Sequence, residues 1–282
     1  MSSSDPRLAL TRVLSNERSG DSVLRLVLDA PQPWGPAAPG QFVQVDCPPS
    51  ESFGLWRPFS LAGARPHDRG TQLEVVYGVV GKRTEGLSRV RPGDEVRVVG
   101  PLGRPFRFAP ARRPILIGGG RGLAPMLFLE ERFRELREDG LLLHGARSAR
   151  LLIPTTGARY AVHLAVEDES FGAPGVGFRG NVIDLLESLC ERNAIDAASI
   201  ALYACGPNKM LEALSRWAAS RGVPCQVSLE THFGCGIGIC AACAVPVLDV
   251  EDGSGDFGRY RFACLDGPVM DGSKVDWSGV VD

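Results

Sequence analysis

The pattern of hydrophobic and polar positions changes twice along the chain. Up to about residue 108, short apolar runs alternate with polar residues and are separated by Gly and Pro. The clearest of these runs cover residues 8–14, 22–28, 41–47, 72–80 and 94–100. Many short strands with turn signals between them predict a small antiparallel barrel.

Between about residues 114 and 225, short apolar runs alternate with segments of helical spacing. In 124–139, Leu127, Phe128 and Phe133 recur at helical spacing among charged residues, which predicts a helix. Further helices are expected over 181–193 and 208–222, and strands over 114–119, 141–145, 161–166 and 199–205. Strand alternating with helix predicts a parallel sheet, which binds ligands at the carboxyl ends of its strands.

The remaining residues show little periodicity and much Gly, Cys and Asp. A block this short is hard to stabilise by core burial alone, and a metal centre would supply the missing free energy. We therefore expect a multi-domain chain. An antiparallel β-barrel domain covers 1–108, an α/β parallel-sheet domain covers 109–225, and a small metal-containing C-terminal domain covers 226–282.

Composition narrows the expected partners and compartment. The chain has 282 residues, 44% of them hydrophobic, and a formal net charge of −2, so we expect no nucleic-acid or membrane partner. The first twelve residues contain no apolar run of a signal peptide, and no stretch is long enough to cross a bilayer. We therefore expect a cytoplasmic protein, in which eight cysteines indicate metal binding or catalysis before disulfides.

Four of the cysteines form one pattern. Cys235, Cys240 and Cys243 follow the spacing C-x4-C-x2-C, and Cys264 lies further along the chain. This is the arrangement of plant-type 2Fe–2S ferredoxins. The sequence therefore predicts that these four cysteines bind a 2Fe–2S cluster.

The glycines between these cysteines fit a tightly wrapped loop. Gly234, Gly236 and Gly238 permit positive φ and close backbone approach, so that N–H groups can donate to the sulfurs. Structural zinc also takes four cysteines, but usually from two short knuckles separated by a spacer. We favour an iron–sulfur cluster, and keep a zinc-stabilised regulatory or binding protein as the alternative.

A flavin site is indicated by side chains in the predicted barrel. The Arg57 guanidinium can hold a pyrophosphate, Pro58 fixes the backbone, and the Ser60 hydroxyl on the same strand can reach a flavin ring. Tyr77 can stack on that ring. Thr84 is expected to be the N-cap of a short helix whose amides face phosphate.

Two glycine turns after predicted strands are candidates for binding nicotinamide nucleotide. They read GGGRGLAP at 118–125 and CGP at 205–207, and glycines there let the backbone approach a pyrophosphate. The binding candidates are Gly118, Gly119, Gly120, Gly122, Gly206 and Pro207. Arg147 or Arg150 could bind the 2′-phosphate that distinguishes NADP from NAD. The sequence therefore does not decide between NAD and NADP.

In this order, the motifs over about residues 8–222 resemble the ferredoxin–NADP reductase superfamily. With the cysteine segment and the run RFACLDGPV, nearly the whole chain resembles the electron-transfer subunits of class B, NAD-dependent dihydroorotate dehydrogenase. The resemblance implies FAD, a 2Fe–2S cluster, and NAD as a substrate. Electrons would come from an FMN-containing dihydroorotate dehydrogenase catalytic subunit in pyrimidine biosynthesis, within a heterotetramer of two plus two chains.

The resemblance also assigns residues. It implies FAD contacts at Arg57, Pro58, Phe59, Ser60, Val76, Tyr77, Gly78, Arg83 and Thr84. The expected catalytic positions are Ser60 and Cys205, the latter near the hydride path. The family often has Arg where this chain has Gly78, and usually has Gly where this chain has Arg83. Related subunits serve sulfhydrogenases and NADH-dependent ferredoxin:NADP reductases, which is the alternative within the oxidoreductases.

Overall fold

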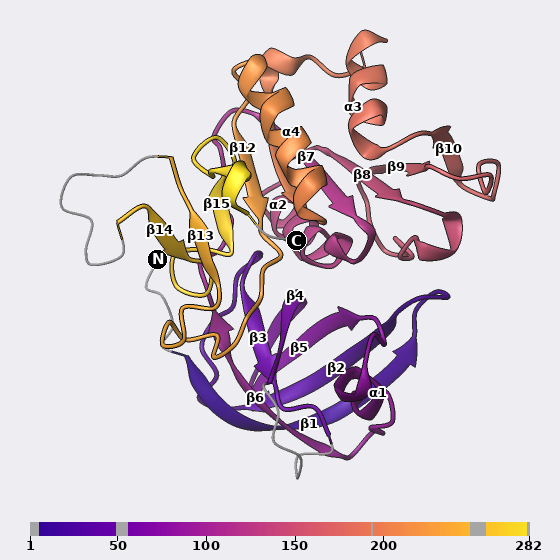
Figure 1. The fold of residues 1–282 in the computed structure, drawn as a ribbon. Helices are drawn as coiled ribbons and strands as arrows, with labels where there is room; N and C mark the ends of the chain where they lie inside the picture. The colour runs from indigo at the N-terminus through magenta and orange to yellow at the C-terminus, as the bar shows by residue number, and fades with distance from the viewer. Residues whose placement is uncertain (1–5, 49–55, 193, 249–257, 281–282) are drawn as a thin grey trace.

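The structure, a computed structural model, describes residues 6–48, 56–192, 194–248 and 258–280. Over these ranges the strands form a closed barrel, a seven-stranded sheet and a two-stranded sheet (Figure 1). Figure 1 shows the barrel below the larger sheet, with the C-terminal strands beside both. The predicted fold class is therefore confirmed.

The barrel is antiparallel throughout, in the order β1-β2-β5-β4-β3-β6. Its strands are β1 (Arg7–Arg18), β2 (Leu24–Pro31), β3 (Phe42–Val45), β4 (Arg57–His67), β5 (Gly70–Tyr77) and β6 (Glu95–Leu102). In β2 the alternate residues Leu26 and Leu28 are fully buried, as the period-2 pattern predicts. One short helix, α1 (Lys82–Leu87), lies between β5 and β6.

The larger sheet has the order β10-β9-β8-β7-β11-β12-β15. Its parallel strands are β7 (Arg113–Gly119), β8 (Leu141–Ala146), β9 (Ala161–Val166), β10 (Val176–Arg179), β11 (Ile200–Cys205) and β12 (Cys225–Ser228). The edge strand β15 (Val269–Asp271) runs antiparallel to β12. The sequence predicted β7, β8, β9 and β11 from apolar runs, and gave no signal for β15.

Helices cover both faces of this sheet. They are α2 (Leu123–Glu135), α3 (Val182–Glu191) and α4 (Asn208–Ser220), with short 3₁₀ turns η1 (Gly120–Gly122), η2 (Ala149–Leu151), η3 (Ala197–Ser199) and η4 (Trp277–Gly279). On β7, Ile115 and Ile117 share a core with α3 and α4, whereas Leu116 packs with α2. All three helices were predicted; Asn193, the last residue of one expected range, lies outside the described residues. No helix in the described ranges has the length and apolar character to cross a membrane.

Helix α2 also fixes the barrel against the sheet. The Phe128 ring is buried within the barrel core, although it belongs to a helix of the sheet domain. The Arg65 guanidinium of β4 forms a salt bridge with the Glu131 carboxylate, with Nη2 and Oε2 3.2 Å apart. These contacts hold the carboxyl ends of β7 and β11 over the barrel.

The C-terminal segment packs on both larger units. Strands β13 (Ala244–Pro246) and β14 (Tyr260–Phe262) form the small sheet, and β15 extends the large one. Cys243 and Cys264 share a buried core with Phe42 of the barrel. Strand β12 spans the predicted boundary at residues 225 and 226. A continuous strand therefore joins the parallel-sheet domain to the C-terminal segment at that boundary.

Candidate functional site

A cavity of about 580 Å³ opens where the barrel meets the parallel sheet. From the barrel and α1 it is lined by the predicted residues Arg57, Pro58, Phe59, Ser60, Val76, Tyr77, Gly78 and Thr84. From the sheet it is lined by Gly122, in the turn after β7, and by Cys205, the last residue of β11. The flavin and nicotinamide candidates therefore meet in one place.

Strand β4 presents the flavin candidates to this cavity. Pro58 and Ser60 pair with Gln44 and Phe42 of β3, so the barrel ladder fixes their positions. The Arg57 side chain is exposed at the cavity. A planar guanidinium there can hold a diphosphate with two parallel hydrogen bonds.

We expect Arg57→Ala to weaken FAD binding. Loss of hydrogen bonds between a cation and a phosphate raises the dissociation constant of FAD by about 10- to 100-fold, and Arg57→Lys by less. Flavin fluorescence during titration of the apoprotein measures this constant. Arg18→Ala, an exposed arginine on β1, is the control. Unchanged FAD affinity in Arg57→Ala would exclude the assigned role.

Tyr77 enters the cavity as a buried ring. Its hydroxyl donates to Oδ1 of Asn16 at 3.0 Å, and its ring lies 5.6 Å from that of Phe59. Burial raises the pKa of Tyr77 to about 12, and the Asn16 hydrogen bond partly opposes this. The ring is thus held in one orientation at the cavity wall and stays neutral.

The prediction that Thr84 caps α1 is wrong. The N-cap is Gly81, and Thr84 lies inside the helix, where its Oγ1 accepts the N–H groups of Val80 and Gly81 at 2.9 and 3.1 Å. A threonine three residues into a helix can reach back to the turn before it. Arg83 does not line the cavity, since its Nη1 donates to the carbonyl of Cys47 at 2.7 Å.

The two glycines that end β7 allow close packing of the chain on itself. A Cβ on Gly118 would lie 2.7 Å from Cα of Leu123, and one on Gly119 would lie 2.9 Å from Cδ of Pro207. Gly120 has φ of +52°, which favours glycine. Of the six nicotinamide candidates, all within the described residues, only Gly122 lines the cavity; Gly118, Gly119, Gly120, Gly206 and Pro207 do not. Pro207 is the N-cap of α4.

Cys205 ends β11 at the cavity and is buried. Burial raises the pKa of its thiol, the nearby Glu230 carboxylate raises it further, and a hydrogen bond with Ser228 lowers it. The thiol therefore stays protonated. A neutral thiol is a poor nucleophile, so any role of Cys205 in the site is one of contact and not of covalent attack.

His144 supports the glycine turn from the neighbouring strand. Its Nδ1 lies 2.9 Å from the carbonyl of Gly118, and its Nε2 lies 2.9 Å from the N–H of Ile153. The ring must therefore be neutral, with the proton on Nδ1. Burial lowers the pKa of His144 to about 4, which the Gly118 hydrogen bond only partly opposes.

Because His144 is buried in its neutral form, we expect the folded protein to lose stability in acid. The unfolded chain takes up the proton near pH 6.5 and the folded chain near pH 4, so stability falls as pH falls between these values. The full loss approaches about 3 kcal/mol. In His144→Gln, the free energy of unfolding from urea titrations should vary less with pH over this range. His163→Gln is the control, and equal pH slopes in wild type and His144→Gln would contradict the assignment.

The first two predicted cluster ligands lie in one loop. The N–H groups of Ile239 and Cys240 lie 3.2 and 3.4 Å from Sγ of Cys235, and the N–H of Cys235 lies 3.3 Å from Sγ of Cys240. Slight burial raises the pKa of Cys235, but the N–H groups of Ile237, Cys240 and Ile239 lower it to about 7. Such donors stabilise thiolate, the form that binds metal.

Glycines let this loop close on itself. Gly236 and Gly238 have φ of +74° and +82°, as the sequence predicted. The described residue Gly234 does not have a positive φ. Its lack of a side chain matters for another reason, because a Cβ there would lie 2.7 Å from Sγ of Cys240. A side chain at Gly234 would therefore displace a ligand.

The other two predicted ligands form a second pair. Cys243 and Cys264 are buried, with Sγ atoms 3.2 Å apart. Burial, and then the neighbouring Cys243 thiol, raise the pKa of Cys264 to about 12. Among the described residues, no three His, Cys, Asp or Glu side chains gather around one point as a single ion requires. Two cysteine pairs suit two irons with two thiolates each, which fits a 2Fe–2S cluster better than zinc.

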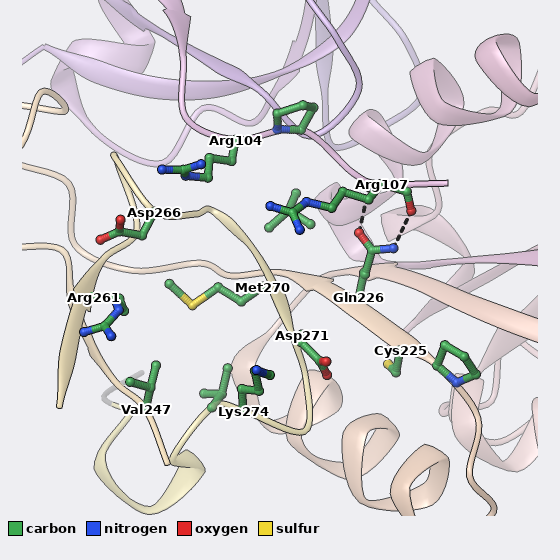
Figure 2. A pocket seen from close by; sticks show the side chains of 14 residues that line it. Arg104, Arg107, Cys225, Gln226, Val247, Arg261, Asp266, Met270, Asp271 and Lys274 are labelled. Atoms are coloured by element: carbon green, nitrogen blue, oxygen red, sulfur yellow. Dashed lines mark hydrogen bonds between the residues drawn. The ribbon is translucent and has the colours of Figure 1, made fainter. Parts of the chain in front are cut away.

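A second hollow, of about 570 Å³, lies between the C-terminal segment and the linker from β6 to β7. Figure 2 shows the reciprocal hydrogen bonds that close one side of it: Gln226 Nε2 donates to the Arg107 carbonyl, and the Arg107 N–H donates to Gln226 Oε1. Arg104 Nε donates to the carbonyl of Leu265 at 3.1 Å. The first two bonds join the linker to β12, and the third joins the linker to the cysteine segment.

Several cavity residues were not predicted. Arg121 lies against Gly78, where a Cβ would meet its Cδ at 3.2 Å and its Nη1 at 3.3 Å. This side chain from the glycine turn therefore lies beside Gly78 at the cavity. Residues 229–233, which end two residues before Cys235, also line the cavity. The position of that segment next to a metal ligand was the available sequence signal.

The fold and the site define a reductase with flavin and nicotinamide sites and an iron–sulfur segment, and the comparisons agree. Residues 230–276 match the family model of the iron–sulfur cluster binding domain of dihydroorotate dehydrogenase B. The chain is 35% identical to the dihydroorotate dehydrogenase B (NAD(+)) electron transfer subunit of Desulforamulus reducens, over 88% of this chain and 90% of that protein. For the same subunit of Shouchella clausii the identity is 36%, over 94% and 96%.

A solved structure is also similar. The structure of an NADH-dependent reduced ferredoxin–NADP oxidoreductase aligns with a TM-score of 0.78 and 28% identity, over 96% of this chain and 91% of that one. The chain belongs to the family of dihydroorotate dehydrogenase B electron transfer subunits. The predicted family, its oxidoreductase electron-transfer class and the expected FAD, 2Fe–2S and NAD are confirmed. An electron transfer subunit implies a catalytic partner.

Proposed function

We propose that this chain passes electrons from an FMN-containing dihydroorotate dehydrogenase catalytic subunit to NAD+, within a heterotetramer of two plus two chains. The observation that supports this most is the shared cavity. It is lined by the flavin candidates of β4 and β5, by the glycine turn at Gly122, and by Phe233, one residue before the cysteine loop begins. The candidate segments for the three cofactors therefore meet at one cavity of the fold.

When bound, FAD exchanges hydride with nicotinamide and single electrons with a 2Fe–2S cluster, so it stands between the two. The residues that would hold it are those of the cavity, with Arg57 at the diphosphate and Tyr77 at the ring. Ser60 and Cys205 line the wall where nicotinamide would approach. We place the cluster on Cys235, Cys240, Cys243 and Cys264.

The surface around the cysteine loop is the side we assign to the catalytic subunit. Ile237 and Ile239 belong to the loop of the exposed Cys240, and Leu265 lies against Gly238 of that loop; the three are 44%, 79% and 48% exposed. A group of exposed apolar side chains is typical of a protein interface. Placing the partner here would bring its flavin close to the cluster.

A second candidate is an NADH-dependent ferredoxin:NADP reductase subunit. The structural similarity to such an oxidoreductase favours it. Arg147 and Arg150 are exposed just beyond the carboxyl end of β8, where a 2′-phosphate could bind. The two candidates differ in nucleotide and in electron partner.

The decisive experiment is co-expression with a candidate catalytic subunit. We expect dihydroorotate-dependent NAD+ reduction only when both chains are present, and a flavin and iron–sulfur absorption spectrum in this chain. Equal activity without this chain would reject the proposal. Preference for NADP and ferredoxin, with no dihydroorotate activity, would support the second candidate. A colourless protein with stoichiometric zinc would support the zinc-stabilised alternative.

A further inference from the structure

A glutamine of the barrel lies directly beneath the cysteine loop. Gln44 belongs to β3, where it pairs with Pro58 of the flavin-binding strand β4, and it is only 1% exposed. Its Nε2 lies 3.4 Å from the carbonyl of Gly234, which begins the loop. The side chain therefore joins the flavin strand to the cluster segment, 190 residues further along the chain.

The loop is shaped around this amide. A Cβ on Gly236 would lie 2.5 Å from Nε2 and 2.8 Å from Cγ of Gln44. Gly236 lies next to Cys235, so the amide nitrogen faces the backbone that carries a predicted ligand. Only a glycine at this position leaves room for the glutamine side chain.

The amide is not explained by packing alone. Its Oε1 is buried and accepts no hydrogen bond from the described part of the chain. An unpartnered buried acceptor is unfavourable, and an apolar side chain of the same size would avoid that cost. The feature that distinguishes glutamine from such a side chain is its pair of Nε2–H donors, and these face the loop.

The same strand contacts the cluster segment a second time. Phe42, two residues before Gln44, lines the flavin cavity and packs against Phe233, with ring centroids 4.9 Å apart. Strand β3 thus contacts the cysteine segment on both sides of Gly234 while it is hydrogen-bonded to β4. One short strand therefore joins the strand of the flavin candidates to the segment of the predicted cluster ligands.

We propose that Gln44 is a positioning residue that holds the cluster loop on the flavin-binding barrel and raises the reduction potential of the cluster through its amide donors. This inference rests on the proposed function, because it requires a bound 2Fe–2S cluster. Gln44 donates to the carbonyl of the Gly234–Cys235 peptide, and the N–H of that same peptide lies 3.3 Å from Sγ of Cys240. The amide therefore strengthens an N–H donor to a ligand sulfur, and such donors stabilise the reduced cluster more than the oxidised one. A donor lost here should lower the potential, and an added carboxylate should lower it further.

The test compares Gln44→Met, which keeps the length and removes the donors, with Gln44→Glu, which keeps the shape and adds charge. Potentiometric titration of the holoprotein followed by electron paramagnetic resonance gives the cluster potential. We expect wild type to be highest, Gln44→Met lower and Gln44→Glu lowest. The reduced-to-oxidised ratio at fixed potential should fall about tenfold in Gln44→Met, equivalent to about 59 mV for a one-electron couple.

Stopped-flow reduction by NADH gives a second readout. Flavin reduction should keep its rate in both variants, whereas the subsequent cluster reduction should slow. Gln72→Met, on β5 and distant from the loop, is the matched control. Loss of iron in Gln44→Met but not in Gln72→Met would also support the positioning role.

The inference is overturned if both Gln44 variants keep the wild-type iron content, potential and cluster reduction rate. Failure of the proposed function would look different: wild-type protein with its catalytic partner would then give no dihydroorotate-dependent NAD+ reduction, while the Gln44 variants would still differ from wild type in cluster potential. The two failures can therefore be told apart.

Discussion

Cys264→Ser should remove the cluster and stop one-electron transfer, while the flavin is still reduced by NADH. Cys264 is 2% exposed, and its Sγ lies 3.2 Å from Sγ of Cys243. Serine is a poorer ligand for iron than thiolate, so iron content should fall from about two per chain towards zero. Electron flow to a one-electron acceptor should fall on the order of 100-fold.

Iron analysis, the visible spectrum and the two half-reactions separate these effects. Cys190→Ser is the control, because Cys190 is a half-buried thiol on α3, remote from the loop. It should leave both iron content and electron flow unchanged. Should Cys264→Ser retain both, the assignment of this cysteine as a ligand fails, and with it the proposed path.

Gly122→Ala is expected to slow reduction by NADH strongly. Gly122 lies where the turn after β7 meets the end of β11, and a Cβ there would overlap the carbonyl group of Cys205 and lie 2.6 Å from N of Gly206. Both neighbours are backbone and cannot rotate away. The two turns must separate, at a cost of about 1–3 kcal/mol in the free energy of unfolding. The rate of flavin reduction at low NADH should fall on the order of 100-fold.

Anaerobic stopped-flow reduction and thermal unfolding measure the two consequences. Gly177→Ala on β10 is the matched control, since nothing lies within 4 Å of a Cβ at that position. The iron–sulfur absorbance should survive in both variants, because the cluster ligands lie on another segment. Normal NADH reduction in Gly122→Ala would show that the two turns can part without affecting the nucleotide site.

The secondary structure of the first two units was largely predictable from local sequence. Apolar runs with turn signals gave the barrel strands, and helical spacing gave α2, α3 and α4. These features are encoded within a few residues, since side-chain periodicity follows directly from backbone geometry. Strand β15 has only three residues and forms by pairing with β12, so no local pattern could reveal it.

In the site, too, local motifs could be predicted and contacts between distant segments could not. The cysteine spacing identified the predicted ligands, because a cluster demands particular residues at particular intervals. Thr84 was misassigned because α1 begins three residues earlier than an N-cap at Thr84 would place it. Arg121 was missed because its contact with Gly78 joins two domains.

The sequence by itself determined the fold class and the family, and it identified the four cysteines predicted to bind the cluster. Each of these depends on motifs that are contiguous or regularly spaced. The tertiary structure alone decided which candidates share a cavity, that the cysteines form two pairs, and that Gln44 lies beneath their loop. The physical reason is range. Spacing along a chain records local geometry, whereas contacts across 190 residues arise only when the packing of whole domains has brought distant strands together.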